Sequence, residues 1–323
     1  MKIPEISIVT PMHNEALSAE AFVVRTYGVL SQMATSFEIV IVNDGSTDLT
    51  ESILEKMVGH YPELRIVSLS RNCGQWAAIY AGIQESIGRY VVILDGDLQH
   101  APEDIPALIS KIIEGYVLVS GARHHRENAR ESFLFRRFPS KVANYLLRKF
   151  TQCPTRDMGG FKCIEGTMAR RLHLRAGQHR LLPALVWMRG GRVVEVPVSS
   201  NPRYAGHSHY GFARSFDVLF DITLFWFQNS FKSRPIYLFG RVSLGIFLIS
   251  FIVLVWVLYQ KFFLHIHMGD RPAFFMSLTG IMMAFAFLSL GFVLEMIAHT
   301  HSEHSESKPY YIHREISQKT QAL

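Results

Sequence analysis

Residues 90–99 read Tyr-Val-Val-Ile-Leu-Asp-Gly-Asp-Leu-Gln, an apolar run that ends in two carboxylates separated by one glycine. An apolar run without alternation is typical of a strand covered on both faces, and in open α/β sheets ligands bind beyond the carboxyl ends of such strands. We therefore expect Asp95 and Asp97 to face a ligand. Two carboxylates this close repel each other unless a cation lies between them, and Mg²⁺ or Mn²⁺ shared with substrate phosphates suits oxygen ligands of this kind. The stretch predicts a metal-bound nucleotide.

Strand-like runs alternate with helical patterns on both sides of this stretch, as far as residue 121. Such alternation predicts an α/β fold with a mostly parallel, Rossmann-like sheet and crossover helices. The predicted strands are 6–10, 37–42, 64–68, 90–94, 117–120 and, further on, 193–198. The predicted helices are 15–33, 47–60, 75–87 and 102–114.

Two long apolar stretches lie in the C-terminal third of the chain. Residues 242–258 and 273–294 carry no charge. The second run alone is as long as the roughly 20 helical residues that cross a bilayer, and the first reaches this length together with residues 236–240. The polar residues between them suit a short hairpin connection. Two buried helices of a soluble domain are the alternative, but uncharged runs of this length favour two transmembrane helices.

These patterns divide the 323 residues into five segments. Residues 212–234 mix aromatic and charged side chains, as a helix in the membrane interface does, although a core helix would also fit. The segments are an α/β domain at 1–211, the interfacial helix at 212–234, transmembrane helices at 235–259 and 273–297, and a polar tail at 298–323.

The charge distribution predicts where the chain resides. The formal net charge is +6, and basic residues gather at 130–149, 170–192 and 232–241, which suits an anionic membrane face. The positive-inside tendency places both termini in the cytoplasm, and no apolar segment of signal-peptide length precedes residue 6. Three scattered cysteines predict no disulfide framework, and no recognition motif indicates nucleic-acid binding. The aromatic spans could face lipid or join copies of the chain into a homo-oligomer.

Polar residues follow each of the first four predicted strands. Any single cluster could be ordinary turn chemistry, but four in succession on one sheet edge predict a binding site. The clusters are Pro11, Asn14 and Glu15; Asn43, Asp44, Gly45, Ser46 and Asp48; Arg71, Asn72 and Gly74; and Asp95, Asp97 and Gln99.

With these motifs the chain resembles a known family, the family 2 glycosyltransferases with the GT-A fold. Within it, the chain is similar to the branch that acts on polyprenyl phosphates, which includes dolichol-phosphate mannosyltransferases and bacterial enzymes that load sugars onto undecaprenyl phosphate. The resembling segments are 11–15 (Pro-Met-His-Asn-Glu), 42–48 (Val-Asn-Asp-Gly-Ser-Thr-Asp), 71–75 (Arg-Asn-Cys-Gly-Gln), 95–99 (Asp-Gly-Asp-Leu-Gln) and 203–208 (Arg-Tyr-Ala-Gly-His-Ser).

The resemblance implies a donor site for a nucleotide-sugar. Asp95 would face the ribose and the metal, while Asp97 and Gln99 would bind the Mg²⁺ or Mn²⁺ that bridges the diphosphate. A divalent cation there would neutralise the charge that the leaving diphosphate gains. The implied nucleotide-sugar-binding residues are Pro11, Asn14, Glu15, Asp44, Arg71, Gly74 and Asp95.

The resemblance also implies an acceptor site for a polyprenyl phosphate. A lipid phosphate is already anionic near neutral pH, so it needs a cationic cradle rather than a strong base. For Arg136 and its basic neighbours, contact with anionic headgroups is the alternative. The implied acceptor-phosphate residues are Arg123, Arg136, Ser140, Arg203 and Ser208. The implied catalytic residues are Asp95, Asp97, Asp157 and Arg203, although Asp157 could instead cap a turn.

Three positions depart from the family pattern: His209 and Lys162 stand where lysine and arginine are more usual, and Asn43 replaces a commoner aspartate. The resemblance implies inverting sugar transfer to a polyprenyl phosphate at the cytoplasmic face of a bacterial inner membrane. The alternatives are a catalytically silent membrane adaptor, a polysaccharide synthase, whose Gln-x-x-Arg-Trp element is absent from the sequence, and a phosphatase with a nucleophilic aspartate. The sequence names neither the sugar nor the nucleotide.

Overall fold

The computed structural model describes residues 3–123, 153–155, 159–199, 201, 236–264, 272–303 and 312–316. The chain forms two compact units. The first comprises Met1–Thr223 together with Lys308–Leu323, and the second is Leu224–Ser307. The C-terminal end of the chain therefore belongs to the same unit as the N-terminal domain.

The first unit contains an eight-stranded sheet in the order β7-β5-β6-β4-β1-β2-β3-β8. Pairing is parallel for β1 with β2 and β4, for β2 with β3, and for β5 with β7, whereas β6 and β8 pair antiparallel with their neighbours. The sheet is therefore mixed but mostly parallel, as predicted. The strands are β1 (Ile6–Met12), β2 (Phe37–Asn43), β3 (Leu64–Leu69), β4 (Tyr90–Ile93), β5 (Leu118–Arg123), β6 (Lys162–Glu165), β7 (Val193–Val198) and β8 (Ile312–Ile316).

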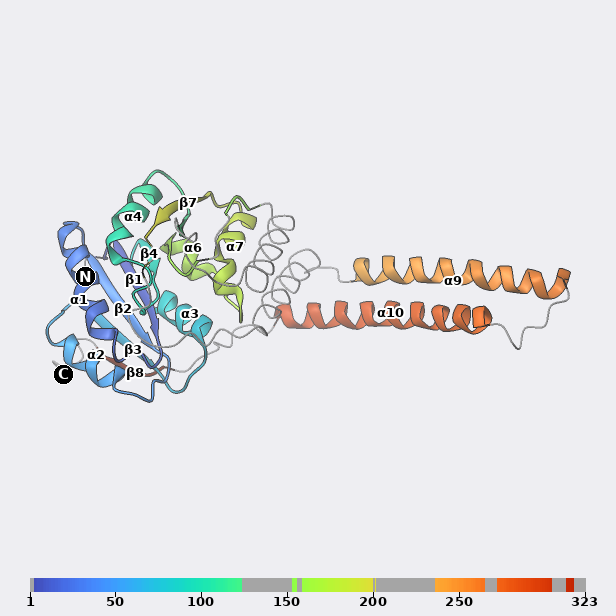
Figure 1. Cartoon of the computed structure of the whole chain (residues 1–323), viewed down its shortest axis with the longest axis horizontal. Helices are drawn as coiled ribbons and strands as arrows, with labels where there is room; N and C mark the ends of the chain where they lie inside the picture. The colour runs from blue at the N-terminus through green and yellow to red at the C-terminus, as the bar shows by residue number, and fades with distance from the viewer. Residues whose placement is uncertain are drawn as a thin grey trace. The chain divides into compact units, whose positions relative to one another are not determined.

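Helices cover both faces of the sheet (Figure 1). One face carries α1 (Ala19–Gln32), α2 (Thr50–Val58), η1 (Pro102–Asp104) and α4 (Ile105–Ile113). The other carries α3 (Gln75–Glu85), α6 (Gly166–Arg171), η2 (Gln178–Leu181) and α7 (Leu182–Met188). Two covered faces explain why the β4 residues are all buried and why their sequence does not alternate.

Alternate residues of the central strands enter two different cores. Ile8 and Ile41 belong to the cluster that includes Phe22 of α1 and Leu54 of α2. Val9 and Val42 face α3, where Gly82 lies so close that an added Cβ would overlap Val9 and come within 3.0 Å of Val42 Cγ2. Glycine at position 82 therefore allows α3 to approach the sheet closely.

The predicted strands all form, with ends within three residues of the predicted bounds. The sequence does not predict β6 or β8. The helix predicted at 15–33 begins only at Ala19, because the backbone N–H groups of residues 14–16 donate to side chains that follow β2 instead. The predicted tail at 298–323 contains β8, and α10 continues into it as far as Glu303.

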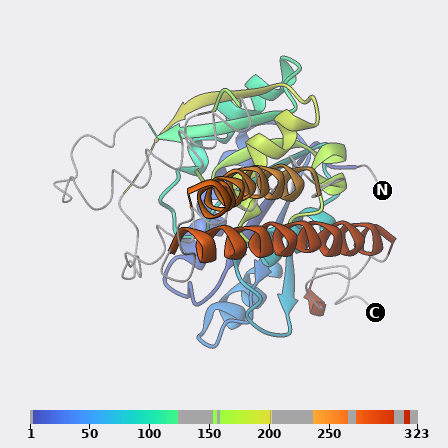
Figure 2. The same cartoon turned by 90° about the vertical axis from the view of Figure 1, so that its right-hand side faces the viewer.

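The second unit contains two long helices, α9 (Ile236–Leu264) and α10 (Pro272–Glu303), which lie side by side (Figure 2). Small residues line their contact: Ser243 Oγ donates to the Ala284 carbonyl at 2.7 Å, and a Cβ on Gly280 would overlap Ser250. Ile236–Leu264 and Pro272–Ile297 are each long and apolar enough to cross a membrane. Most of their large apolar side chains are exposed, as lipid-facing side chains would be. The predicted interfacial helix at 212–234 lies outside the described residues.

The close approach of α3 predicts that Gly82→Ala destabilises the protein by about 1–3 kcal/mol, since the new methyl group overpacks against Val9. Gly28→Ala is the control, because Gly28 lies inside α1 and nothing would come within 4 Å of its Cβ. Thermal unfolding of the full chain in detergent measures the stability of both variants. A midpoint for Gly82→Ala at or above that of the parent protein would contradict the proposed close packing.

Candidate active site at the carboxyl edge of the sheet

The carboxyl ends of β1, β2, β3 and β4 lie at one edge of the sheet because these strands are parallel. The four predicted polar clusters follow these strands, so they meet at this edge. β6 runs in the opposite direction and therefore begins there, with Gly159 and Gly160 just before it. The sequence predicts the first four contributions from the strand ends, and from the segment before β6 it names only Asp157, as what the resemblance implies.

The two aspartates lie on a tight turn that follows β4. Asp97 is 8% exposed, and its Oδ1 accepts a hydrogen bond from the Gln99 backbone N–H at 3.0 Å. Leu98, which follows Asp97, has a φ of 58°, a left-handed conformation that is uncommon for a residue with a branched side chain. Local backbone strain of this kind clusters at ligand sites, where surrounding contacts hold it. The turn directs two carboxylates to the edge of the sheet.

Asp95 is held from two sides. Gln75 Nε2, at the first residue of α3, donates to Asp95 Oδ1 at 2.9 Å. Gly160 packs against the same carboxylate, so that a Cβ there would overlap Asp95 Oδ2 and lie 2.9 Å from its Cγ. These contacts restrict the orientation of Asp95.

Lys162 supports the backbone around Gly160. It is 2% exposed, and its ammonium group donates to the Gly159 carbonyl and, at 3.4 Å, to the His179 carbonyl. A buried ammonium group is tolerated only when acceptors surround it, and here the acceptors lie in the loop before β6 and in η2. The lysine that departs from the family pattern thus fixes the segment that packs against Asp95.

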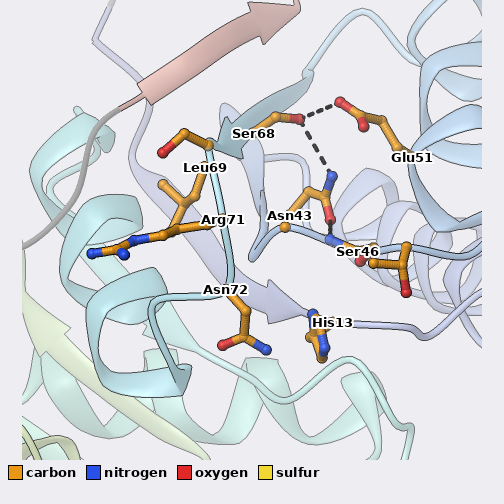
Figure 3. Close-up of a pocket in the computed structure, with 11 residues that line it drawn as sticks. His13, Asn43, Ser46, Glu51, Ser68, Leu69, Arg71 and Asn72 are labelled. Carbon is orange, nitrogen blue, oxygen red and sulfur yellow. Dashed lines mark hydrogen bonds between the residues drawn. The ribbon is translucent and has the colours of Figure 1, made fainter.

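A cavity of about 530 Å³ lies beside the ends of β1, β2 and β3 (Figure 3). Hydrogen bonds connect several of the residues that line it. The Ser68 hydroxyl donates to Glu51 Oε1 at 2.7 Å. Asn43 Nδ2 lies 3.5 Å from the same hydroxyl, and Asn43 Oδ1 accepts from the Ser46 N–H at 3.1 Å. The cavity is lined by His13, Asn43, Gly45, Ser46, Thr47, Glu51, Ser68, Leu69, Ser70, Arg71 and Asn72.

Asp44 and Gly45 shape the cavity by fixing the loop after β3. Both carboxylate oxygens of Asp44, which is 3% exposed, accept backbone N–H groups, from Cys73 at 2.7 Å and Gly74 at 2.9 Å. Gly45 has a φ of +59°, and a Cβ there would lie 2.5 Å from the Asn72 nitrogen. Only glycine fits this approach. The position of Arg71 and Asn72 therefore depends on the loop after β2.

The segment after β1 bonds to the segment after β2. Asn14 has a φ of 54°, and its Oδ1 accepts from the Thr47 N–H at 2.8 Å. Asp48 accepts from the Ala16 N–H at 3.2 Å and from both donors of Thr50. Burial raises the pKa of Asp48, but the hydrogen bonds from Thr50 and Ala16 outweigh it and hold the pKa below the usual range. This aspartate is therefore charged at neutral pH and ties the two segments together.

The described structure brings together one group of the predicted site residues at this edge. These are Pro11, Asn14, Glu15, Asp44, Arg71, Gly74, Asp95, Asp97 and Gln99. For Arg123 the structure describes only the backbone, at the end of β5. Asp157, Arg136, Ser140, Arg203 and Ser208 lie outside the described residues. Their roles stay predictions. Asn201, two residues before Arg203 in the sequence, donates its backbone N–H to the Gln99 carbonyl at 2.8 Å.

Sequence reasoning assigned no role to Gln75, Gly160, Glu51 or Ser68. Gln75 ends the resembling segment 71–75 and Gly160 lies three residues after the predicted Asp157, but neither position predicts a contact with Asp95. Glu51 and Ser68 gave none, because their hydrogen bond exists only once α2 has packed beside β3.

The donor set around Asp95 and Asp97 fits a divalent cation. No group of three histidine, cysteine, aspartate or glutamate side chains suited to a metal occurs among the residues that the structure describes. Two carboxylates and the Gln99 amide are nonetheless a sufficient protein contribution, because Mg²⁺ is commonly held by one or two carboxylates plus substrate phosphates. Asp95, Asp97 and Gln99 are the residues that would hold the ion.

Comparison with known proteins identifies the class to which this fold and site belong. A family model described as glycosyl transferase family 2 matches residues 7–169. The chain belongs to this family. The match includes four of the five resembling segments, among them the turn at Asp95 and Asp97.

Two similar proteins match almost the whole length of this chain. A dodecaprenyl-phosphate galacturonate synthase of Rhizobium johnstonii is 33% identical over 319 residues, 97% of this chain and 93% of the relative. An undecaprenyl-phosphate 4-deoxy-4-formamido-L-arabinose transferase of Shewanella sediminis is 30% identical over 317 residues, 95% and 91% of the two chains. The resemblance to bacterial polyprenyl-phosphate glycosyltransferases is confirmed.

Solved structures confirm the GT-A-like fold of the first unit. Glucosyl-3-phosphoglycerate synthase from Mycobacterium tuberculosis, in complex with Mn²⁺ and UDP-glucose, matches 69% of this chain and 79% of its own with a TM-score of 0.53 at 16% identity. The same synthase with Mn²⁺, UDP and glucosyl-3-phosphoglycerate matches 68% and 80% with a TM-score of 0.52 at 19% identity.

The Gln75 contact predicts that Gln75→Ala weakens metal-dependent nucleotide binding, because Asp95 loses the donor that orients it. We expect the Mn²⁺ concentration for half-maximal UDP binding to rise about tenfold, the size expected for one hydrogen bond to a charged group. Gln84→Ala is the matched control: Gln84 lies in the same helix and donates to the Arg170 carbonyl at 3.0 Å, away from the carboxylates. Equal Mn²⁺ requirements for the two variants would show that Gln75 does not position Asp95.

Proposed function

We propose that this chain is a membrane glycosyltransferase that moves a sugar from a nucleotide donor to a polyprenyl phosphate. The observation that carries the proposal is the Asp95–Asp97 turn at the carboxyl edge of the sheet, the same edge that holds a cavity large enough for part of a nucleotide. The names of the two relatives described above supply the acceptor class, since both act at a polyprenyl phosphate.

The donor is a nucleotide-sugar held at this edge. Arg71, Asn72 and Glu51 line the cavity with groups that can bind a base and ribose. The two aspartates at the same edge of the sheet would face the diphosphate. A divalent cation bound there would neutralise the charge that develops on the leaving diphosphate. The structures of the mycobacterial synthase with Mn²⁺ and UDP support this choice of ligands. The chain's own contribution is to hold Asp95 through Gln75 and Gly160 before the donor arrives.

The acceptor phosphate would be placed by the basic segments of the chain. A lipid phosphate with a second pKa of about 6 is anionic at neutral pH, so it attacks the anomeric carbon without a strong base. Arg123, Arg136, Ser140, Arg203 and Ser208 are the proposed cradle, with Asp157 near the donor sugar. A single attack from the face opposite the diphosphate would invert the anomeric configuration.

The chain would span the inner membrane of a bacterium as a hairpin, with both termini in the cytoplasm. β8 follows α10 in the sequence and pairs with β3, which precedes α9. A strand cannot join a sheet across a bilayer, so the chain must enter and leave the hairpin on the same side. The basic residues before α9 favour the cytoplasmic side.

Transfer of labelled sugar tests this proposal. The purified full chain is incubated with undecaprenyl phosphate, Mg²⁺ or Mn²⁺ and a panel of radiolabelled UDP- and GDP-sugars, and label extracted into organic solvent is counted. We expect label from one donor and a loss of at least about 100-fold in Asp97→Asn, because that change removes a carboxylate placed for the metal. Glu20→Gln, an exposed change in α1, should keep full activity.

A chain that binds UDP with Mn²⁺ but transfers no sugar from any donor would favour the silent adaptor. Transfer that survives in Asp97→Asn would contradict the assignment of the site.

A further inference from the structure

The C-terminal strand β8 is an edge strand of the sheet and lies next to β3, whose end borders the proposed donor cavity. It pairs antiparallel with β3, with Ile66 opposite Ile316, Val67 opposite Glu315, Ser68 opposite Arg314 and Leu69 opposite Ile312. Because the pairing is antiparallel, the chain enters β8 at the carboxyl end of β3, where the cavity lies. In Figure 3 the arrow of β8 passes beside Ser68 and Leu69.

The register changes within this pairing at the residue nearest the cavity. One step along β3, from Ser68 to Leu69, corresponds to two steps along β8, which leaves His313 as the extra residue of a bulge. Bulges are over-represented next to active sites, where they re-aim a side chain or end a ladder. Here the bulge lies opposite Ser68, whose hydroxyl donates to Glu51 in the cavity wall.

The loop that follows β3 is fixed at both of its ends. At its far end, Asp44 accepts the N–H groups of Cys73 and Gly74. At its near end, Leu69 is 4% exposed and is the last β3 residue paired with β8. The residues between these two anchors, Ser70, Arg71 and Asn72, all line the cavity. Without β8, β3 would be an edge strand, and the near anchor would lose its pairing partner.

We propose that β8 is a positioning segment for the donor site: by pairing with β3 it holds residues 70–72 in place for the nucleotide. This inference rests on the proposed function of the cavity. Loss of β8 should therefore weaken binding of the nucleotide-sugar and leave binding of the lipid acceptor unchanged.

Two C-terminal deletions of the full chain test the proposal. Deletion of residues 308–323 removes β8, and deletion of residues 317–323 keeps it. We expect the first deletion to raise the KM for the nucleotide-sugar and the Kd for UDP with Mn²⁺ about tenfold, as expected when two side chains must be ordered on binding. The KM for undecaprenyl phosphate should stay within about twofold, and the second deletion should match the parent protein.

A pair of point variants covers the case in which the longer deletion fails to fold. Arg314→Pro removes a backbone N–H from the middle of β8, whereas Arg314→Ala keeps it. Hydrogen exchange at residues 66–72 should become faster in the proline variant only, and its donor KM should rise as in the deletion. If the proline variant raises both KM values equally and speeds exchange throughout the first unit, β8 supports the whole fold and the proposed specific role at the donor site is wrong.

Three results would overturn the proposal: an unchanged donor KM in Arg314→Pro with faster exchange in β3, equal changes in both KM values, or equal effects of the two deletions. The 308–323 deletion can also be mixed with an Asp97→Asn chain, which keeps β8 but lacks the Asp97 carboxylate. Recovery of donor affinity in this mixture would show that β8 pairs with β3 of another chain, and would overturn pairing within one chain. Failure of the proposed function is distinguishable, because then the parent protein itself transfers no sugar, while UDP binding and exchange still measure the effect of β8.

Discussion

The parallel alignment of the first four strands is the constraint on which the rest of the structure depends. It brings the ends of these strands to one edge, and so places Asp95 and Asp97 beside the loops of the other three strands. Two neighbouring carboxylates repel each other, and this repulsion is relieved by a cation that also attracts phosphate oxygens. In the proposed donor complex, a metal and a nucleotide diphosphate would together compensate the charge of these two carboxylates. The two apolar helices of the second unit suit a reaction whose other substrate is a membrane lipid.

The site is held by contacts that leave little room for movement. Gly45 and Gly160 each allow a close approach, one to the backbone of the Arg71 loop and the other to the carboxylate of Asp95. Buried polar groups then fix the approaching segments: Asp44 binds the backbone after β3, and Lys162 binds the backbone before β6. Such preorganisation means that the donor does not have to order the site when it binds. The strand β8 extends the same principle to the C-terminal end of the chain.

The sequence predicts most of the sheet and the strand ends that meet at the candidate site, for physical reasons. Strands β1 to β4 are apolar, so their burial is visible in their composition, and the aspartates that follow β4 could be assigned to the sheet edge. The strand β6 begins with Lys162 and is four residues long, and β8 reads Ile-His-Arg-Glu-Ile. Neither has a distinctive pattern, because each is a strand only through pairing with partners far away in the sequence. The contact of Gln75 with Asp95 likewise depends on how α3 packs and is not contained in any local pattern.

The most direct test of the central claim is the structure of the full chain with UDP and Mn²⁺, determined by electron cryomicroscopy. We expect the ion at Asp97, with Asp95 beside it, the diphosphate on the same ion, and the base in the cavity next to Arg71. An ion bound away from both aspartates, or a nucleotide bound elsewhere on the chain, would contradict the claim that this edge of the sheet is the donor site.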